Sequence, residues 1–297
     1  MLPRQILPGS TYLLSRRCTQ RQFLLAPTNS LTAIFGYCLA AAAVRCGVQV
    51  HAVCVMSNHW HAVVTDPQGR IPEFCAYVHR LVAKAVNASL GRWENLWATE
   101  QPSLVRLLGP DDVLAKTSYV VCNPVLAGLV ARAQRWPGLL RYLPQHSQSF
   151  RRPAVFFREE GTMPKDVRLE LTVAPSLAHL GKAEIERRLS AQVRAQEQRM
   201  ERQLAKTGRK VVGAERVRAE APTGRPRSRE PRRGVHPRFA AGASGLGVQM
   251  VERLKAFVAA YRDAWQRWRR GAHLVLFPAG TYALRIHAGV RCQPALG

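Results

Sequence analysis

Residues 48–65 read VQVHAVCVMSNHWHAVVT, two valine-rich stretches separated by a Ser-Asn pair at 57–58. β-Branched residues favour strands, and a small polar pair between two such stretches is typical of a tight hairpin. Side chains two residues apart in a strand point to the same face of the sheet. The second stretch therefore predicts a strand on which His59 and His61 share one face, while the residue between them points to the other.

The flanking segments continue a regular alternation of strands and helices, divided by turn-forming and helix-capping residues. The predicted elements in chain order are a strand at Thr11–Ser15, a helix starting at 27–30 and ending near Cys46, strands at Val48–Met56 and His61–Thr65, a helix at about Pro72–Leu90, a strand at Ser103–Leu108, and a helix that starts at 109–112, passes Tyr119 and ends at Asn123-Pro124. This order is that of an α/β (α+β) domain of the ferredoxin-like kind with an added helix. We expect residues 5–145 to form a four-stranded antiparallel sheet with two helices on one face and the histidine-bearing strand in the centre.

The charge of the chain points to a polyanionic partner. The 297 residues include 44 Lys and Arg against 19 Asp and Glu, a formal net charge of +25 with a pI of about 11.1. Such an imbalance suits nucleic acid or an anionic membrane surface. The longest apolar stretch, Ile34–Val44, is shorter than the ~20 residues that cross a bilayer. We interpret it as a buried helix rather than a signal peptide, and we expect nucleic acid and no membrane.

The seven cysteines are odd in number, scattered, and form no CxxC pair. Cysteine used in this way is typical of a reducing compartment, where it acts as a small buried hydrophobe. We therefore expect a cytoplasmic protein with no disulfide and no zinc knuckle.

Beyond about residue 150 the composition changes, and we expect a basic, mostly helical C-terminal extension there. Residues 151–206 are predicted to be partly helical. Residues 207–245 contain GRPRSREPRR at 224–233, whose Arg, Pro and Gly predict a basic disordered linker. Residues 246–297 predict an amphipathic helix followed by a hairpin over His273–Val290.

Two weak signals become informative in combination. His59 and His61 on one strand face can reach one divalent ion, although an HxH pair is as often a surface or hydrogen-bonded pair. Tyr119 and Asn123 lie four residues apart and share a helix face, although such a pair is usually packing plus a helix cap. A phenol hydroxyl and a carbonyl oxygen beside two imidazoles would supply a nucleophile and a third metal ligand.

The two motifs resemble those of the HUH single-tyrosine transposases, and most closely the REP-associated tyrosine transposases. The first is MSNHWHAVV at 56–64, where the family pattern is roughly M-x-N-H-x-H. The second is YVVCNPVLAGLV at 119–130, where the pattern is roughly Y-I-x-x-N-P-V-R-A-G-L-V, so that Leu126 stands where the family usually has Arg. The resemblance covers roughly residues 5–145.

The resemblance implies that residues 1–150 form an HUH transposase domain acting on single-stranded, hairpin-forming DNA. It implies Tyr119 as the nucleophile of a 5′-phosphotyrosine intermediate, and His59, His61 and Asn123 as ligands of Mg²⁺ or Mn²⁺. It also implies a protein associated with the bacterial nucleoid. Members of the family often form dimers, which makes a homodimer an expectation.

Other interpretations of the same residues stay open. Tyr77 is a rival nucleophile, but Leu81 stands four positions on, where a ligand-type residue would be needed. Arg80 and Lys84 share a helix face and either contact DNA phosphates or are simply solvated.

The alternative function is a non-catalytic nucleic-acid-binding protein on a ferredoxin-like fold with a basic tail. A module of that class reads bases with aromatic side chains on its strands. A third hypothesis is an interaction protein that binds its partner through the basic tail.

Overall fold

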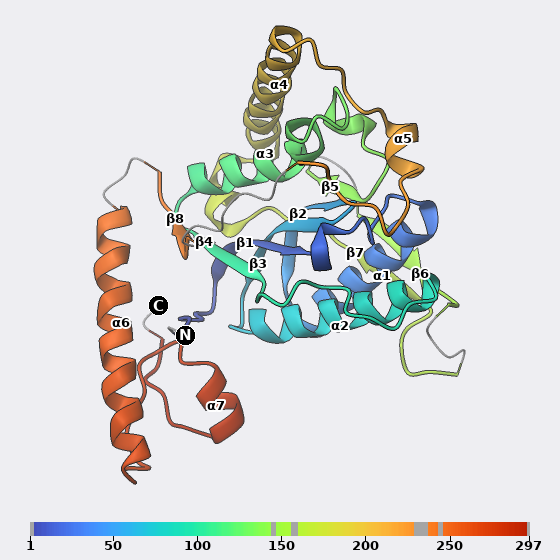
Figure 1. The fold of residues 1–297 in the computed structure, drawn as a ribbon. Helices are drawn as coiled ribbons and strands as arrows, with labels where there is room; N and C mark the ends of the chain where they lie inside the picture. Colours follow the sequence, from blue (N-terminus) through green and yellow to red (C-terminus); the bar gives the residue numbers. More distant parts are fainter. Residues whose placement is uncertain (1–2, 144–146, 156–159, 229–236, 243–245, 296–297) are drawn as a thin grey trace.

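The computed structural model describes residues 3–143, 147–155, 160–228, 237–242 and 246–295, and its centre is a mostly antiparallel sheet (Figure 1). The sheet has six strands in the order β5-β2-β3-β1-β4-β8, and β6 and β7 form a separate pair. The strands are β1 Ser10–Arg17, β2 Gln49–Met56, β3 His59–Asp66, β4 Ser103–Leu107, β5 Leu140–Tyr142, β6 Gln148–Arg151, β7 Asp166–Leu169 and β8 Phe239–Ala240. The expected four-stranded antiparallel sheet is present, in the order β4-β1-β3-β2 with β3 inside it, and β5 and β8 extend it at the two edges.

Helices cover both faces of this sheet. The α-helices are α1 Asn29–Cys46, α2 Ile71–Ser89, α3 Pro110–Leu126, α4 Lys182–Lys206, α5 Ala214–Arg218, α6 Leu246–Arg269 and α7 Ala283–Ala288. Three short 3-10 helices lie at η1 Thr19–Arg21, η2 Ala133–Arg135 and η3 Pro175–Leu180. In Figure 1, α1 and α2 lie together on one side of the sheet and α3 lies on the other. The two helices predicted for one face are therefore α1 and α2, and the added helix is α3.

The β2-β3 hairpin fixes which side chains face which layer. The strands pair antiparallel with Met56 opposite His59, so that only two residues form the turn. Trp60 is fully buried on the side of α1 and α2, where its ring meets Phe35 at 5.2 Å and His79 at 5.6 Å. His59 and His61 consequently point to the opposite side, which we call the histidine face, beneath α3.

Helix α1 is the predicted apolar helix, and it lies in the core. Among the described residues it is the helix long and apolar enough, by length and composition alone, to cross a membrane, and 61% of that window is buried in the protein. Gly36 lets the ring of Phe150 lie directly against the helix backbone. This burial against β2, β6, β7 and α2 explains its composition as that of a packed core helix.

The entry to α2 is fixed by a buried carboxylate. Asp66 is fully buried at the end of β3, and its Oδ2 accepts a hydrogen bond from Ile71 N (2.6 Å) while Oδ1 accepts from Arg70 N (2.8 Å) and Gln68 N (3.3 Å). These are the unpaired N–H groups of a first helical turn, which an anion satisfies well. The strand that bears the histidines is thereby tied to the helix behind it.

The prediction that Asn123-Pro124 ends the third helix is wrong. Helix α3 continues through Pro124 to Leu126, and the chain turns at Gly128, which has φ +70°. Proline removes one helical N–H, but Pro124 and Val125 are buried, and Ala127 N still donates to Asn123 O (3.0 Å). Burial of this last turn offsets one missing hydrogen bond.

The C-terminal extension differs in two places from what the sequence predicts. Within the predicted disordered linker 207–245, residues 229–236 and 243–245 lie outside the described residues, but α5 buries Val217 completely and β8 pairs parallel with β4. In place of the predicted hairpin over His273–Val290, α7 forms, and Phe277 makes an isolated parallel bridge to Cys292. In Figure 1, α6 stands at one edge of the molecule.

His51, the other histidine of the hairpin, lies in the core and is not part of the histidine pair. It sits at a register shift in β2, where its Nδ1 donates to Thr172 O (2.8 Å) and its Nε2 accepts from Thr65 Oγ1 (2.7 Å). Burial lowers the pKa of His51 to about 4, against the opposing hydrogen bond to Thr172. The folded protein therefore keeps the His51 ring neutral near pH 7.

We predict that acidification destabilises the fold through His51. Its pKa is lower in the folded state than the ~6.5 of an unfolded chain, so the unfolded state binds the proton first and stability is lost as the pH falls from about 6.5 towards 4. Between pH 7 and pH 5 the free energy of unfolding should fall by about 2 kcal/mol through this group. Urea unfolding at both pH values should show a smaller loss in His51→Gln than in the wild type.

The control is His287→Gln, at an exposed position of α7, which should keep the wild-type pH dependence. An identical loss in wild type and His51→Gln would show that His51 is not the group responsible.

Candidate active site

Four side chains from the two sequence motifs meet on the histidine face. His59 and His61 of β3 place their ring centroids 4.9 Å apart, and the ring of Tyr119 on α3 lies 5.4 Å from that of His61. One helical turn after Tyr119, Asn123 brings its Oδ1 to 3.2 Å from His59 Nε2. Asn123 is buried, whereas Tyr119 is 36% exposed. The structure thus joins the strand motif and the helix motif in one cluster.

Asn58 determines how the His59 ring is presented. The Asn58 Nδ2 donates to Arg21 O (3.1 Å), which turns its Oδ1 towards His59 Nδ1 at 2.7 Å. The Nδ1–H therefore donates to Asn58, and the neutral ring carries its lone pair on Nε2. Arg21 sits in a turn whose backbone has positive φ at Gln20 (48°) and Arg21 (59°). Residues other than glycine rarely adopt a positive φ, so contacts with the surrounding residues must hold this backbone in place.

The arrangement of acceptors fits a divalent cation. The lone pair of His59 Nε2 faces the carbonyl oxygen of Asn123, so two acceptors converge on the same space. Two ligand atoms at about 2.1 Å from an ion and at right angles lie about 3 Å apart, close to the 3.2 Å observed. His61 adds a buried Nδ1 that has no hydrogen-bond partner within the described chain. No three His, Cys, Asp or Glu side chains gather into a metal site in the described part of the chain. Asn123 is the side chain of the cluster that could add a third ligand to the two imidazoles.

Burial controls the protonation of the cluster. It lowers the pKa of His59 to about 4; the hydrogen bond that a protonated ring would donate to Asn123 opposes the shift, and the charge of Arg21 adds to it. Burial, followed by the proximity of His59, lowers the pKa of His61 as well. Neutral imidazoles are the form that binds a metal. Burial raises the pKa of Tyr119, against a hydrogen bond with Asn123 that lowers it, so Tyr119 is a phenol near neutral pH.

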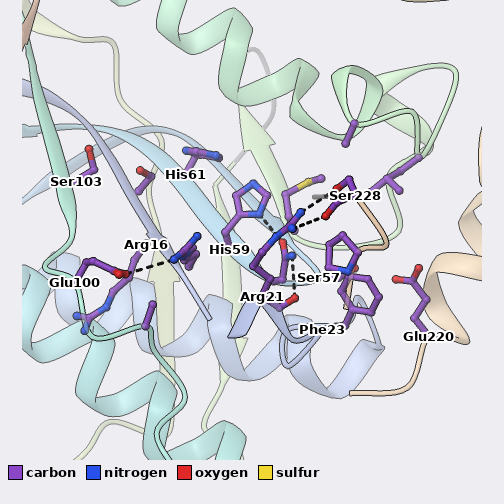
Figure 2. A pocket seen from close by; sticks show the side chains of 18 of the residues that line it. Arg16, Arg21, Phe23, Ser57, His59, His61, Glu100, Ser103, Glu220 and Ser228 are labelled. Carbon is purple, nitrogen blue, oxygen red and sulfur yellow. Dashed lines mark hydrogen bonds and ion pairs between the residues drawn. The ribbon is translucent and has the colours of Figure 1, made fainter. Parts of the chain in front are cut away.

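A cleft of about 680 Å³ opens beside the two histidines (Figure 2). Its lining includes Arg16 and Arg17 from β1 and Arg21 from η1. Arg17 pairs directly with His59 across the sheet, which places both on the histidine face, and its guanidinium lies 3.6 Å from Glu100. Guanidinium groups suit phosphate oxygens in geometry and in charge. These arginines could not be predicted from the sequence, because they become neighbours of the histidines only in the folded chain.

Residues 219–228, which we call the strap, form one wall of the same cleft. Glu220, Pro226 and Ser228 of the strap line it, and Figure 2 shows Ser228 next to Arg21. Arg21 Nη1 and Nη2 donate to Ser228 O (2.7 Å) and Oγ (3.0 Å). Phe23 N donates to Gly224 O (2.9 Å). This stretch of the predicted disordered linker is therefore part of the site.

The other residues considered from the sequence lie elsewhere. Tyr77 is on α2, behind the opposite face of the sheet, where its hydroxyl donates to Met163 Sδ (3.3 Å). Arg80 stacks on Tyr77 with 5.4 Å between guanidinium carbon and ring centroid, and Lys84 is exposed one turn further on. Neither Arg80 nor Lys84 lines the cleft. A role for them in DNA binding stays a prediction.

Comparison with known proteins gave similarities among solved structures. No family model and no curated protein matches the chain. A REP-associated tyrosine transposase, in a structure described as bound to a REP hairpin, is similar at 17% identity with a TM-score of 0.40, over 46% of this chain and 78% of that one. A putative transposase from Deinococcus radiodurans R1 is similar at 20% identity with a TM-score of 0.28, over 32% of this chain and 76% of that one. Likenesses this distant do not assign a function, which depends on the residues of the site.

We predict that Asn58 positions His59 for metal binding. Asn58→Ala removes the acceptor that holds Nδ1–H, so the ring loses its preferred tautomer and orientation, and Mn²⁺ affinity should fall about 10- to 100-fold. The ¹⁵N chemical shifts of the His59 ring should change from a predominantly Nδ1–H form to a mixture of tautomers. Titration with Mn²⁺ and ring-nitrogen NMR on the same samples measure both effects.

Asn87→Ala is the matched control, since Asn87 likewise donates its amide to a backbone carbonyl, Glu94 O (2.6 Å), at the far end of α2. It should alter neither readout. An Asn58→Ala protein with wild-type ring shifts would show that another contact orients His59.

Proposed function

We propose that this protein nicks and rejoins single-stranded DNA, as a transposase does, through a covalent 5′-phosphotyrosine on Tyr119. The observation that carries the proposal is the meeting of Tyr119 and Asn123 of α3 with His59 and His61 of β3, with Asn123 Oδ1 at 3.2 Å from His59 Nε2. Packing alone gives no reason for two acceptors to converge on one point. A nucleophile beside a cation site accounts for all four side chains.

The chemistry required is displacement at phosphorus. A phosphodiester repels nucleophiles because it is an anion, and the guanidinium groups of Arg17 and Arg21 in the cleft would offset that charge. The Tyr119 oxygen attacks phosphorus and loses its proton, the P–O3′ bond breaks, and the released strand leaves with a 3′-OH. The phosphotyrosine keeps the free energy of the broken linkage, so attack by a 3′-OH restores a phosphodiester and the phenol.

We propose that His59, His61 and Asn123 hold the divalent ion, either Mg²⁺ or Mn²⁺. When bound, the ion would neutralise a non-bridging phosphate oxygen and favour loss of the phenol proton. Two imidazoles and one amide suit Mn²⁺ at least as well as Mg²⁺, which prefers oxygen ligands. The raised pKa of Tyr119 explains why the phenol needs such help near neutral pH.

The substrate class follows from charge and from the motifs. The net charge of +25 suits a polyanion, and the resemblance of the motifs to REP-associated transposases supports hairpin-forming single strands. On the same grounds we propose a cytoplasmic, nucleoid-associated protein that is able to form homodimers. These features extend the proposal and do not carry it.

The alternative, a non-catalytic module that reads bases with its sheet, is less compatible with the fold. Such modules expose aromatic rings on their central strands. Trp60 is the aromatic residue of β2 and β3, and it is fully buried against Phe35 and His79. The histidine face of β3, beneath α3, presents imidazoles instead.

We predict that Tyr119→Phe abolishes covalent capture and leaves the fold intact. The substitution keeps the ring against His61 and removes only the attacking oxygen. Labelled single-stranded hairpin DNA incubated with Mn²⁺ should give a wild-type adduct on a denaturing gel and none with the variant. Mass spectrometry of the wild-type adduct should find the nucleotide on the peptide that contains Tyr119.

Tyr77→Phe is the control and should retain adduct formation. Finding the nucleotide on Tyr77 would contradict the assignment of α3 as the catalytic helix.

Substitutions of the three proposed metal ligands should differ in their effects on cleavage. His59→Ala and His61→Ala should abolish cleavage while DNA binding persists, because each removes a ligand and leaves the arginines of the cleft in place. Asn123→Ala should lower the cleavage rate about 10- to 100-fold, since water can fill one metal position. Cleavage rates measured against Mn²⁺ concentration test this, and full activity in either histidine variant would exclude the metal site.

A further inference from the structure

A second cavity of about 560 Å³ adjoins the candidate active site and has no role so far in the proposed chemistry. Its walls come from four stretches that are far apart in sequence: residues 4–12 before and within β1, residues 99–106 before and within β4, the residues around β8, and α6. In Figure 1 these segments lie side by side at the β4-β8 edge of the sheet. The fold thus gathers four stretches of the chain around one hollow.

The second cavity shares a border with the cleft beside the histidines. Glu100, Gln101 and Ser103 line both. Ser103 pairs with Ser15, which in turn pairs with His61, so the shared border starts at the level of the histidines. Within the described residues β8 pairs with β4 only at Arg106 and Leu107, so the edge of β4 at Ser103 is not covered by a neighbouring strand. A polymer in the cleft can therefore cross this edge into the second cavity.

Three arginines converge on the second cavity from three of these segments. Arg4 Nη1 donates to Pro102 O (2.9 Å) and Arg238 Nη1 donates to Pro3 O (2.6 Å), which fixes both guanidinium groups at the wall. The pKa of Arg4 is lowered first by burial and then by the charge of Arg238. Like charges brought together in a partly buried place favour the binding of an anion between them. Glu100 lies at the border and is ion-paired with Arg17 on the cleft side.

The remaining wall is apolar. Met250 and Leu254 lie one turn apart on α6, and Ile6, Leu104 and Phe239 face the same hollow. An apolar wall opposite a set of guanidinium groups matches a nucleotide, whose base is flat and largely apolar on its faces and whose phosphate is an anion. A duplex is far wider than this hollow, so a single strand is the form that can enter.

We propose that the second cavity binds one nucleotide of the DNA strand that flanks the scissile phosphodiester, with the base against the apolar wall and its phosphate on Arg4, Arg106 and Arg238. This rests on the proposed function, because it assumes a single strand in the cleft. The second cavity then holds the flank and fixes which phosphodiester lies beside Tyr119. Arg106, whose guanidinium has no hydrogen bond or ion pair within the described residues, is the arginine most available to the phosphate.

The test couples flank length to Arg106. Affinity is measured by fluorescence anisotropy in the Tyr119→Phe background, so that no cleavage occurs, with oligonucleotides whose 5′ and 3′ flanks are shortened one nucleotide at a time. On one side, loss of the nucleotide that reaches the second cavity should weaken binding about tenfold, the size of one charge-assisted hydrogen bond. In Arg106→Ala that step should disappear, and the salt slope with the long flank should fall by about one.

Arg199→Ala is the matched control, since it removes the same charge from an exposed position of α4 outside both cavities. It should keep the step in flank length. An equal loss for Arg106→Ala and Arg199→Ala at every flank length would overturn the proposal.

The base is tested separately with 2-aminopurine placed at successive flank positions. One position should show a fluorescence change on binding, and Met250→Asp, at the apolar wall, should abolish it while Met250→Leu retains it. An equal change of 2-aminopurine fluorescence at every flank position would overturn the proposal. This result does not depend on Arg106→Ala, so it holds even if that variant distorts the sheet edge.

The outcomes separate the two proposals. A covalent adduct without the flank-length step contradicts the second cavity alone. The step without any adduct contradicts the nicking activity and leaves the second cavity as a single-strand binding site.

Discussion

The register between β1 and β3 is the constraint on which the rest of the structure depends. Because side chains alternate across a strand, a shift of one residue would turn Trp60 to the histidine face and bury the two imidazoles against α1 and α2. Trp60 is fully buried between Phe35 and His79, so such a shift would expose a large apolar ring and bury unpaired polar atoms. The same register brings Arg17 next to His59 and Ser15 next to His61. The core on one face therefore determines the chemistry on the other.

The cluster is rigid because each polar contact is supported by another. The strained turn at Gln20 and Arg21 presents a carbonyl to Asn58, Asn58 orients His59, and His59 faces Asn123. A positive φ at two consecutive non-glycine residues costs free energy, which the packed surroundings must offset. A site held in this way is oriented before any ion or substrate arrives, so little ordering is left for binding to accomplish. The same turn carries Arg21 into the cleft, so the turn that helps to orient His59 also places a positive charge beside it.

The sequence predicts the parts of this structure that depend on local signals. Valine-rich strands and helix-capping residues predicted the central sheet and helices α1 to α3, because each of these signals lies within a few residues. The spacings of the His and Tyr-Asn pairs, combined with the family resemblance, predicted the four residues of the cluster. The end of α3 was misjudged at Pro124, where burial outweighs a missing N–H. Strand β8, helix α7 and the strap are short or polar and are formed by contacts with distant segments, such as Arg106 N with Arg238 O. Arg17 and Arg21 belong to the cleft only through tertiary placement, while the more conspicuous Arg80 and Lys84 lie on a helix away from it.

The C-terminal extension is part of the fold of the layer that carries Tyr119 rather than an appended tail. Ile185 and Leu189 of α4 and Val217 of α5 are buried with Val120, Val121 and Val125 of α3, the helix that carries Tyr119. Glu197 of α4 is buried and accepts a hydrogen bond from Ala133 N (2.8 Å), just after that helix. Phe150 and Val167 complete the core around α1 on the other face. Removing residues 150–297 would therefore expose apolar surface on both layers and loosen α3 over the histidines. Loss of DNA binding or of nicking after such a truncation would be expected of an enzyme as much as of a tail-driven binder. Single substitutions in the cluster and the cleft distinguish an enzyme from a tail-driven binder, because they leave both hydrophobic cores intact.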